Sequence, residues 1–203
     1  MVGKQISHFE GQIDYPGSGG AVFLEEGSNG KKVIKVSRAD DIIEDLVHGE
    51  KATLAGRISD AVHIENYYIQ EIEAMKLADR LGLRKFYGEV EVKNLDRLLD
   101  SSVYAENRYL LSKRAYSMDY VDGGWPSEMR QYITQETLTD AMAKYRRLYD
   151  AGYVQGDFQF LVTREGKAEI IDFGSVRPIT TGSSFDTWDS VLARIKQELG
   201  LSD

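Results

Sequence analysis

Residues 156–174 read GDFQFLVTREGKAEIIDFG. Two short apolar segments, 160–163 and 168–171, flank a Glu-Gly-Lys turn, and this pattern predicts a β-hairpin. Two aspartates, Asp157 and Asp172, stand before and after the hairpin, 15 residues apart in the sequence. The hairpin can bring both carboxylates to one cleft. Carboxylates there suit a metal ion bound to phosphates, and one of them can take a proton from a hydroxyl.

A glycine-rich turn lies near the start of the chain, with Gly17, Ser18, Gly19 and Gly20 between apolar residues. Because glycine lacks a side chain, backbone N–H groups in such a turn can approach the phosphates of a nucleotide. An ordinary hairpin turn has the same composition and is the alternative interpretation. The flanking residues predict an antiparallel meander of three strands: Ile6–Tyr15, Ala21–Glu26 and Lys32–Val36.

A lysine, Lys35, stands inside the apolar strand segment Val-Ile-Lys-Val. It faces either the interior or the solvent, depending on the register of the strand. A helical segment further along carries two glutamates, Glu71 and Glu73, and Glu71 directly precedes the apolar residue Ile72. We expect Glu71 to reach Lys35. Glu73 is the competing candidate, and an exposed helix glutamate is the ordinary alternative for each.

The rest of the chain predicts strands followed by helices, which is typical of an α+β fold. The expected elements are a helix with an apolar stripe at Ile64, Tyr68, Ile72 and Met75 ending before Gly82, strands Phe86–Val92 and Tyr109–Lys113, a break at 123–126, a helix Thr137–Ala151 and a terminal helix from Trp188 to Leu199. We expect a single domain with a strand-rich N-lobe, residues 1–116, and a helical C-lobe, residues 117–203.

Composition excludes several classes of protein. The 203 residues carry 33 acidic and 25 basic side chains, a net charge of −8, and no cysteine. Disulfide scaffolds, thiolate zinc sites and cysteine nucleophiles are therefore excluded, and the acidity argues against binding to nucleic acid or an anionic membrane. No apolar run is long enough to span a bilayer. Three histidines, His8, His48 and His63, lack the short spacing of metal ligands.

In their order and context these motifs resemble a protein kinase over about residues 12–190. The resemblance implies a minimal bilobal protein-kinase-like fold that uses ATP and Mg²⁺, with the glycine-rich turn covering the phosphates. It also implies that Lys35 binds the phosphates as a catalytic residue and pairs with Glu71. By the same resemblance Asp172 is the D-F-G metal ligand, and Asp157 is the general base toward the substrate hydroxyl.

Two further assignments follow from the same resemblance. Residues 109–116 would carry the last strand of the N-lobe and the adenine hinge, with Arg114 and Tyr116 as nucleotide contacts. Gln159 would be a second metal ligand, because it stands before an apolar strand where kinases have an asparagine.

The chain also departs from the kinase pattern. Residues 155–157 read Gln-Gly-Asp where kinases have H-R-D, and the catalytic loop is three residues shorter than D-x-x-x-x-N. The glycine-rich turn matches two of the three kinase glycines, and residues 38–63 add a helix before the expected one. After Gly174 there is no A-P-E segment, so we expect a truncated helical C-lobe with a very short activation segment at 175–184.

The short activation segment is rich in hydroxyl groups, which predicts either modification sites or an ordinary polar loop. The hydroxyl-bearing residues are Ser175, Thr180, Thr181, Ser183 and Ser184.

A minimal, acidic kinase without cysteine resembles the HopBF family of bacterial type III effectors. That resemblance implies a serine/threonine protein kinase secreted into the host cytoplasm, which phosphorylates and inactivates the host heat-shock chaperone Hsp90. Hsp90 would then be both substrate and binding partner, and we expect a monomer. If the chain is not secreted, we expect it in the cytoplasm. The alternatives are a small-molecule kinase, a kinase resembling the tRNA-modification kinase Bud, and a pseudokinase that acts as a binding module.

Overall fold

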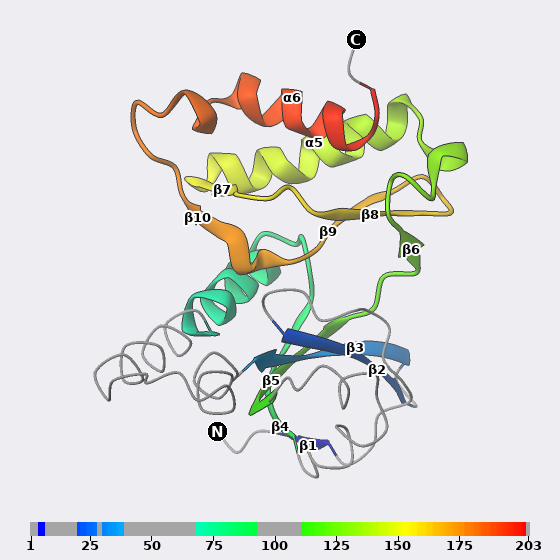
Figure 1. Cartoon of the computed structure of the whole chain (residues 1–203), viewed down its shortest axis with the longest axis vertical. Coiled ribbons are helices and arrows are strands. Elements are labelled where there is room, and N and C mark those ends of the chain that lie inside the picture. Colours follow the sequence, from blue (N-terminus) through cyan, green and yellow to red (C-terminus); the bar gives the residue numbers. More distant parts are fainter. Residues whose placement is uncertain (1–3, 7–19, 28–29, 39–67, 93–110, 202–203) are drawn as a thin grey trace, which may run out of the picture. The chain divides into compact units, whose positions relative to one another are not determined.

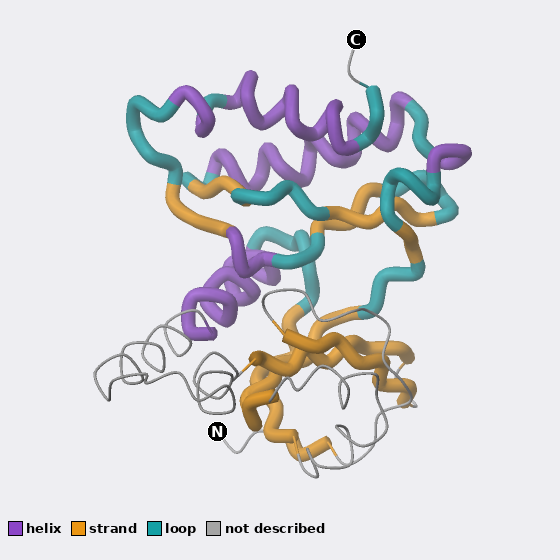
Figure 2. The backbone as a smooth tube through the Cα atoms, viewed as in Figure 1, coloured by secondary structure: helices purple, strands orange, loops and turns teal. Residues whose placement is uncertain are grey.

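The computed structural model describes residues 4–6, 20–27, 30–38, 68–92 and 111–201. Two compact units are present. The first comprises residues Met1–Ile72 and Phe86–Tyr120, and the second comprises Glu73–Lys85 and Val121–Asp203. Helices and mainly antiparallel sheets make up these units, which is the α+β class expected from the sequence. Figures 1 and 2 show how these elements follow one another along the chain.

The first unit contains a five-stranded sheet with the strand order β1-β4-β5-β3-β2. Its strands are β1 (Lys4–Ile6), β2 (Gly20–Gly27), β3 (Gly30–Arg38), β4 (Phe86–Val92) and β5 (Leu111–Asp119). All neighbouring pairs are antiparallel except β1 and β4, which are parallel. The central strands of this sheet are therefore β4, β5 and β3.

The expected hairpin of the second and third meander strands is confirmed, and the expected first strand lies mostly outside the described residues. β2 and β3 form a hairpin, but β1 pairs with β4, with Lys4 opposite Val90. The predicted strand Ile6–Tyr15 is described only at Ile6, and residues 7–15 lie outside the described part of the chain. The β1 pairing was not predictable from turn composition, because its partner strand is about 80 residues away in the sequence.

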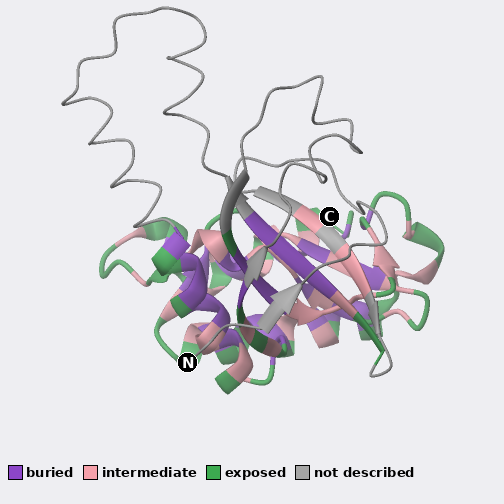
Figure 3. Ribbon diagram, turned by 90° about the horizontal axis from the view of Figure 1, so that it is seen from below, coloured by how far each residue is buried: buried purple, intermediate pink, exposed green. Residues whose placement is uncertain are grey.

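Helix 68–80 follows the apolar stripe that the sequence predicted. Tyr68, Ile72 and Met75 are all buried, while Ile64 lies outside the described residues. The helix ends where Gly82 takes a left-handed conformation with φ of +63°, which glycine adopts without strain. In β3, residues 33–36 form one buried run, as the colouring by burial shows (Figure 3).

The second unit contains helices, two small sheets and three short 3-10 turns. Its elements are β6 (Gly123–Gly124), η1 (Arg130–Tyr132), α5 (Gln135–Asp150), β7 (Tyr153–Gln155), β8 (Phe160–Thr163), β9 (Ala168–Ile170), η2 (Phe173–Ser175), β10 (Val176–Pro178), η3 (Ser184–Asp186) and α6 (Trp188–Glu198). The hairpin β8–β9 and both long helices were expected from the sequence, whereas the β7–β10 and β6–β8 pairings were not.

Helix α5 begins at a capping box. The Thr134 hydroxyl accepts hydrogen bonds from the backbone N–H groups of Glu136 and Thr137, and the Thr137 hydroxyl oxygen accepts one from the Thr134 N–H. This cap starts the helix two residues before the predicted position. Helix α6 lies along α5 (Figure 1). Between the two helices, the rings of Trp188 and Tyr149 make an edge-to-face contact with centroids 5.5 Å apart.

A buried lysine attaches the hairpin to α5. The Lys144 ammonium donates to the carbonyl oxygen of Ala168 at 2.8 Å and to the carboxylates of Asp140 and Glu169. Asp140 in turn accepts from the N–H of Ala168 at 2.9 Å. These bonds hold β9 against the helix and therefore set the position of the residues that follow β9, including Asp172.

Candidate functional site

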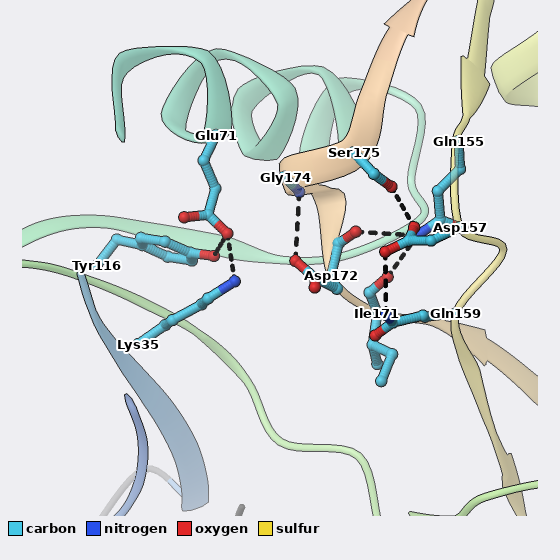
Figure 4. A network of polar contacts seen from close by, with 10 residues as sticks. All are labelled: Lys35, Glu71, Tyr116, Gln155, Asp157, Gln159, Ile171, Asp172, Gly174 and Ser175. Carbon is cyan, nitrogen blue, oxygen red and sulfur yellow. Dashed lines mark hydrogen bonds and ion pairs between the residues drawn. The ribbon is translucent and has the colours of Figure 1, made fainter. Parts of the chain in front are cut away.

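The first group of candidate residues lies in the first unit and centres on Lys35 and Glu71. The Lys35 ammonium donates to the Glu71 carboxylate, and the two residues are 7% and 1% exposed (Figure 4). Glu73, the competing candidate, is exposed and pairs with Lys76 one turn further along the helix. The structure therefore confirms the expected contact between Lys35 and Glu71.

A tyrosine completes this group. Tyr116 lies directly opposite Lys35 in the β3–β5 register, and its hydroxyl donates to Glu71 Oε1 at 3.0 Å, the same oxygen that Lys35 contacts (Figure 4). Glu71 Oε2 is buried and has no hydrogen-bond partner among the described residues. Two donors on one oxygen keep the carboxylate in a single orientation.

The charges of this pair are taken out of water, which costs free energy that the ion pair and its hydrogen bonds must offset. In return the lysine is already ordered. A pre-ordered side chain loses less rotamer entropy when it binds an anion such as a phosphate. The pair is therefore suited to anion binding, although a purely structural ion pair has the same geometry.

Tyr68 fixes the start of the described helix against β5. Its hydroxyl donates to the Ala115 carbonyl at 3.2 Å and to Glu89 at 3.3 Å, and Arg114 lies over its ring. Burial, together with the negative charge of Glu89, raises the pKa of Tyr68, so the hydroxyl stays a donor. Because Tyr68 and Glu71 are three residues apart, they share one face of the helix, and the anchor also places Glu71.

Arg114 and Tyr116, which the kinase resemblance assigned to the adenine contact, lie inside β5 and not at its end. Strands β3 and β4 flank β5 on its two sides, and Tyr116 is opposite Lys35 on one and Glu89 on the other. The backbone at these positions belongs to the sheet. Tyr116 instead contributes its side chain to the Lys35 and Glu71 group, a role that the sequence did not reveal.

The second group lies in the second unit, on the loop between β7 and β8. Asp157 is exposed, whereas the next residue, Phe158, is buried and stacks on Tyr145 with ring centroids 5.0 Å apart. Phe158 has a φ of +51°, a conformation that is strained for an aromatic residue. Burial of its ring holds the strained loop in place and leaves the Asp157 carboxylate at the surface.

Both carboxylate oxygens of Asp157 accept hydrogen bonds. Gln159 donates from Nε2 to Oδ2 at 2.9 Å, and the Ser175 hydroxyl donates to Oδ1 (Figure 4). The sequence placed Gln159 beside Asp157 but did not predict the contact with Ser175, which depends on the unexpected pairing of β7 with β10.

Asp172 follows β9 and is also in a left-handed conformation, with φ of +50°. Its side chain accepts from the Gly174 N–H at 3.4 Å, so it caps the short turn η2. Phe158 and Asp172 are the two non-glycine residues with positive φ in the described ranges. Strain of this kind persists only where the surrounding structure enforces it, and it concentrates at functional sites.

Gln155 enforces the conformation at Asp172. This residue is completely buried, and its amide nitrogen donates to the carbonyl oxygens of Ile171 at 2.7 Å and Asp172 at 2.9 Å (Figure 4). Its amide oxygen accepts from the Tyr145 hydroxyl at 2.7 Å. Burial raises the pKa of Tyr145 well above its ordinary value, and the charge of Asp157 adds to that effect. Sequence reasoning noted Gln155 only as a departure from H-R-D.

The segment after the D-F-G tripeptide is held by an ion pair. The Arg177 guanidinium donates two hydrogen bonds of 2.7 Å to the carboxylate of Asp186, which also accepts from the Thr180 N–H at 2.9 Å. The hydrogen bonds from Arg177 lower the pKa of Asp186 to about 2. This bidentate pair closes residues 177–186 into a defined loop.

The residues proposed as metal ligands, Asp172 and Gln159, supply one carboxylate and one amide oxygen. Among the described residues, no group of three or more His, Cys, Asp or Glu side chains that could hold a metal ion is present. Magnesium commonly binds through one or two carboxylates together with water and the phosphates of a substrate. This donor set therefore fits Mg²⁺ that arrives with a nucleotide better than a resident metal ion.

The glycine-rich turn is mostly outside the described residues. Gly17, Ser18 and Gly19 are not described, and Gly20 is the first residue of β2, opposite Ser37. The three histidines also lie outside the described residues. The phosphate-binding role of the glycine-rich turn and the expectation that the histidines do not bind a metal ion therefore stay predictions.

Two comparisons with known proteins found no relative. No family model matches the chain, and a search of curated proteins found no significant match. No helix in the described part of the chain has both the length and the apolar character needed to cross a membrane.

Proposed function

We propose that this protein is an ATP-dependent protein kinase. The observation that carries the proposal is the buried contact between Lys35 and Glu71, 36 residues apart in the sequence. The kinase pattern favours Glu71 over Glu73 as the partner of Lys35, and the contact is between Lys35 and Glu71. A buried ammonium held by a carboxylate, which a tyrosine hydroxyl keeps in position, is a suitable partner for nucleotide phosphates.

Each residue of the two groups has a role in the proposed reaction. Lys35 binds the phosphates, Glu71 and Tyr116 hold Lys35 in position, and Asp172 and Gln159 would hold Mg²⁺. When bound, Mg²⁺ neutralises charge on the phosphates. Asp157 accepts the proton of the acceptor hydroxyl.

The exposure of Asp157 supports its role as the base. An acceptor hydroxyl from another molecule must come within hydrogen-bond distance of that carboxylate, so the base has to be accessible. The bonds from Gln159 and Ser175 limit the rotation of the carboxylate and keep it oriented. For the adenine contact, the backbone where β5 ends at Asp119 is a better candidate than Arg114 and Tyr116.

The acceptor in this proposal is a serine or threonine of a protein, and the resemblance to the HopBF effectors makes host Hsp90 the first substrate to test. The same resemblance supports delivery by a type III system into the host cytoplasm. A small-molecule or Bud-type kinase would use the same residues with a different acceptor, and a pseudokinase would bind the nucleotide without transfer.

The experiment incubates the purified full chain with Mg-ATP labelled on the γ-phosphate, once with purified Hsp90 and once with a eukaryotic lysate. We expect a discrete labelled protein, and we expect its labelling to be strongly reduced with the Asp157→Asn variant. General base catalysis contributes about a hundredfold to ten-thousandfold, so residual transfer should fall by that factor. Label that appears only in small molecules would support the small-molecule alternative, and no transfer to any acceptor would overturn the proposal.

A second measurement separates the base from the nucleotide-binding residues. Thermal unfolding with and without Mg-ATP reports nucleotide binding. Asp157→Asn should keep the stabilisation by Mg-ATP, whereas Asp172→Asn and Lys35→Met should lose most of it. Equal stabilisation of all three variants by Mg-ATP would contradict the roles of Lys35 and Asp172 in nucleotide binding.

A further inference from the structure

Ser175 makes a contact that the proposed function uses only to orient the Asp157 carboxylate. Its hydroxyl donates to Oδ1 of Asp157, although the two residues are 18 positions apart (Figure 4). The backbone places it there. Gly156 N–H donates to the Ser175 carbonyl at 3.0 Å, and the next pair of residues, Gln155 and Val176, continues this ladder as the β7–β10 pairing.

A hydroxyl that donates to a carboxylate has the arrangement of a nucleophile with its base. We propose that Ser175 is the protein's own phosphorylation acceptor, with Asp157 as the base. This inference rests on the proposed kinase function and adds a modification site to it.

In the proposed step, the Ser175 oxygen forms a bond to the γ-phosphorus of ATP. The bond between that phosphorus and the oxygen bridging to the β-phosphate breaks, and ADP leaves with the electron pair. The Ser175 proton moves to Asp157. The products are phosphoserine at position 175 and ADP.

The other hydroxyls of the same segment are less suited to be acceptors. The Thr180 hydroxyl accepts from Arg177 at 3.4 Å, and Arg177 is itself held by Asp186. In the described part of the segment 175–184, Ser175 is the residue whose hydroxyl donates to a carboxylate. The geometry therefore favours Ser175 as the acceptor, whereas the sequence did not distinguish among the hydroxyl-bearing residues of this segment.

Phosphorylation of Ser175 would also limit the enzyme. A phosphate carries a charge between about −1.5 and −2 at neutral pH and would stand beside the Asp157 carboxylate. Like charges repel, and the phosphate occupies the place of an incoming hydroxyl. The phosphorylated form should therefore transfer phosphate to other acceptors more slowly than the unmodified form, by about tenfold or more.

The test begins with full-length protein treated with phosphatase and then freed of the phosphatase. It is incubated with Mg-ATP, and phosphate is located by mass spectrometry of peptides in the wild type, Ser175→Ala and the control Ser183→Ala. We expect phosphate at Ser175 in the wild type and the control, formed at a rate per molecule that does not depend on protein concentration. Transfer to a second acceptor, Hsp90 or casein, is measured in the same tubes.

The outcomes separate this inference from the proposed function. Label on the second acceptor without phosphate at Ser175 overturns the inference and leaves the kinase proposal standing. Phosphate at Ser175 that forms only at high protein concentration also overturns it, because Asp157 of the same molecule is then not the base. If no acceptor is labelled, both the Ser175 inference and the proposed kinase function are overturned.

A third measurement needs no nucleotide. Urea unfolding of Ser175→Ala, Asp157→Ala and the double variant tests whether the two side chains interact in the folded protein. We expect the midpoint shift caused by Ser175→Ala to shrink by at least half when Asp157 is already alanine. Additive shifts would show that the contact is absent in solution and would overturn the inference.

Discussion

Tyr116 donates its hydroxyl to the same oxygen of Glu71 that Lys35 contacts. The three side chains come from β5, the helix 68–80 and β3, and all three are buried. A carboxylate that holds two donors with one oxygen is fixed in position, and so is the lysine beside it. Of the two glutamates on this helix, Glu71 should therefore contribute much more than Glu73 to the stability of the folded protein.

Glu71→Ala should destabilise the protein strongly, because it leaves Lys35 as a buried charge without its carboxylate. Breaking a buried pair in this way costs about 3 to 5 kcal/mol. Glu73→Ala is the matched control on the same helix and removes only an exposed pair with Lys76, which contributes little to stability. Urea unfolding measures both. Similar losses for the two variants would contradict the assignment of Glu71.

Tyr116→Phe removes one hydroxyl and leaves the ring in place. We expect a loss of about 1 to 2 kcal/mol, because a hydrogen bond to a charged group in the interior is lost. Tyr87→Phe is the control, since Tyr87 is an exposed tyrosine of β4 in the same unit. The Michaelis constant for ATP should rise in Tyr116→Phe if the hydroxyl orients the lysine, and an unchanged value would restrict Tyr116 to a structural role.

Gln155→Met keeps the volume of a buried side chain and removes its amide. The hydroxyl of Tyr145 and the carbonyl oxygens of Ile171 and Asp172 would then lose their partner, at a cost of about 3 kcal/mol. Because Asp172 is the proposed metal ligand, more Mg²⁺ should be needed for half-maximal transfer. Gln197→Met, at an exposed position of α6, should change neither quantity. A Gln155→Met protein with normal Mg²⁺ dependence would show that the amide does not position Asp172.

The Arg177–Asp186 pair predicts a dependence of stability on acidity. The pKa of Asp186 is about 2 in the folded protein against an ordinary value of 3.8, so the folded state favours the charged carboxylate. The stabilisation is fully present above about pH 4 and is lost as the pH falls toward 2. Asp186→Asn should be less stable than the wild type at pH 7, and the difference should shrink between pH 4 and pH 2. Asp189→Asn, on the surface of α6, is the control, and a difference independent of pH would contradict this account.

Several elements were predictable because their signals are local. The turn Glu165-Gly166-Lys167 lies between two apolar segments, and the hairpin β8–β9 forms there with Gly166 at a positive φ of +73°. The apolar stripe at Tyr68, Ile72 and Met75 has helical spacing, and those residues are buried on the helix 68–80. Spacing along the chain reports which face of one element is covered.

The contacts at the candidate site depend on residues that are far apart in the sequence. The choice of Glu71 over Glu73 was expected from the kinase pattern, but the part played by Tyr116 depends on the β3–β5 register, which places it opposite Lys35. The contact of Ser175 with Asp157 depends on the pairing of β7 with β10. A register between distant strands follows from the packing of the whole unit, and a shift of one residue would turn each of these side chains to the opposite face.

The amino-acid order therefore determines where the hairpin β8–β9 and the long helices lie, and it supplies the residue types that the proposed phosphoryl transfer requires. Only the tertiary structure decides that β1 joins β4, that Gln155 holds the carbonyl of Asp172, and that the hydroxyl of Ser175 meets the proposed base. The physical reason is the distance along the chain over which each interaction acts. Backbone propensity and hydrophobic period act over a few residues, whereas hydrogen bonds between residues 17 or 18 positions apart require strands that pair only in the folded chain.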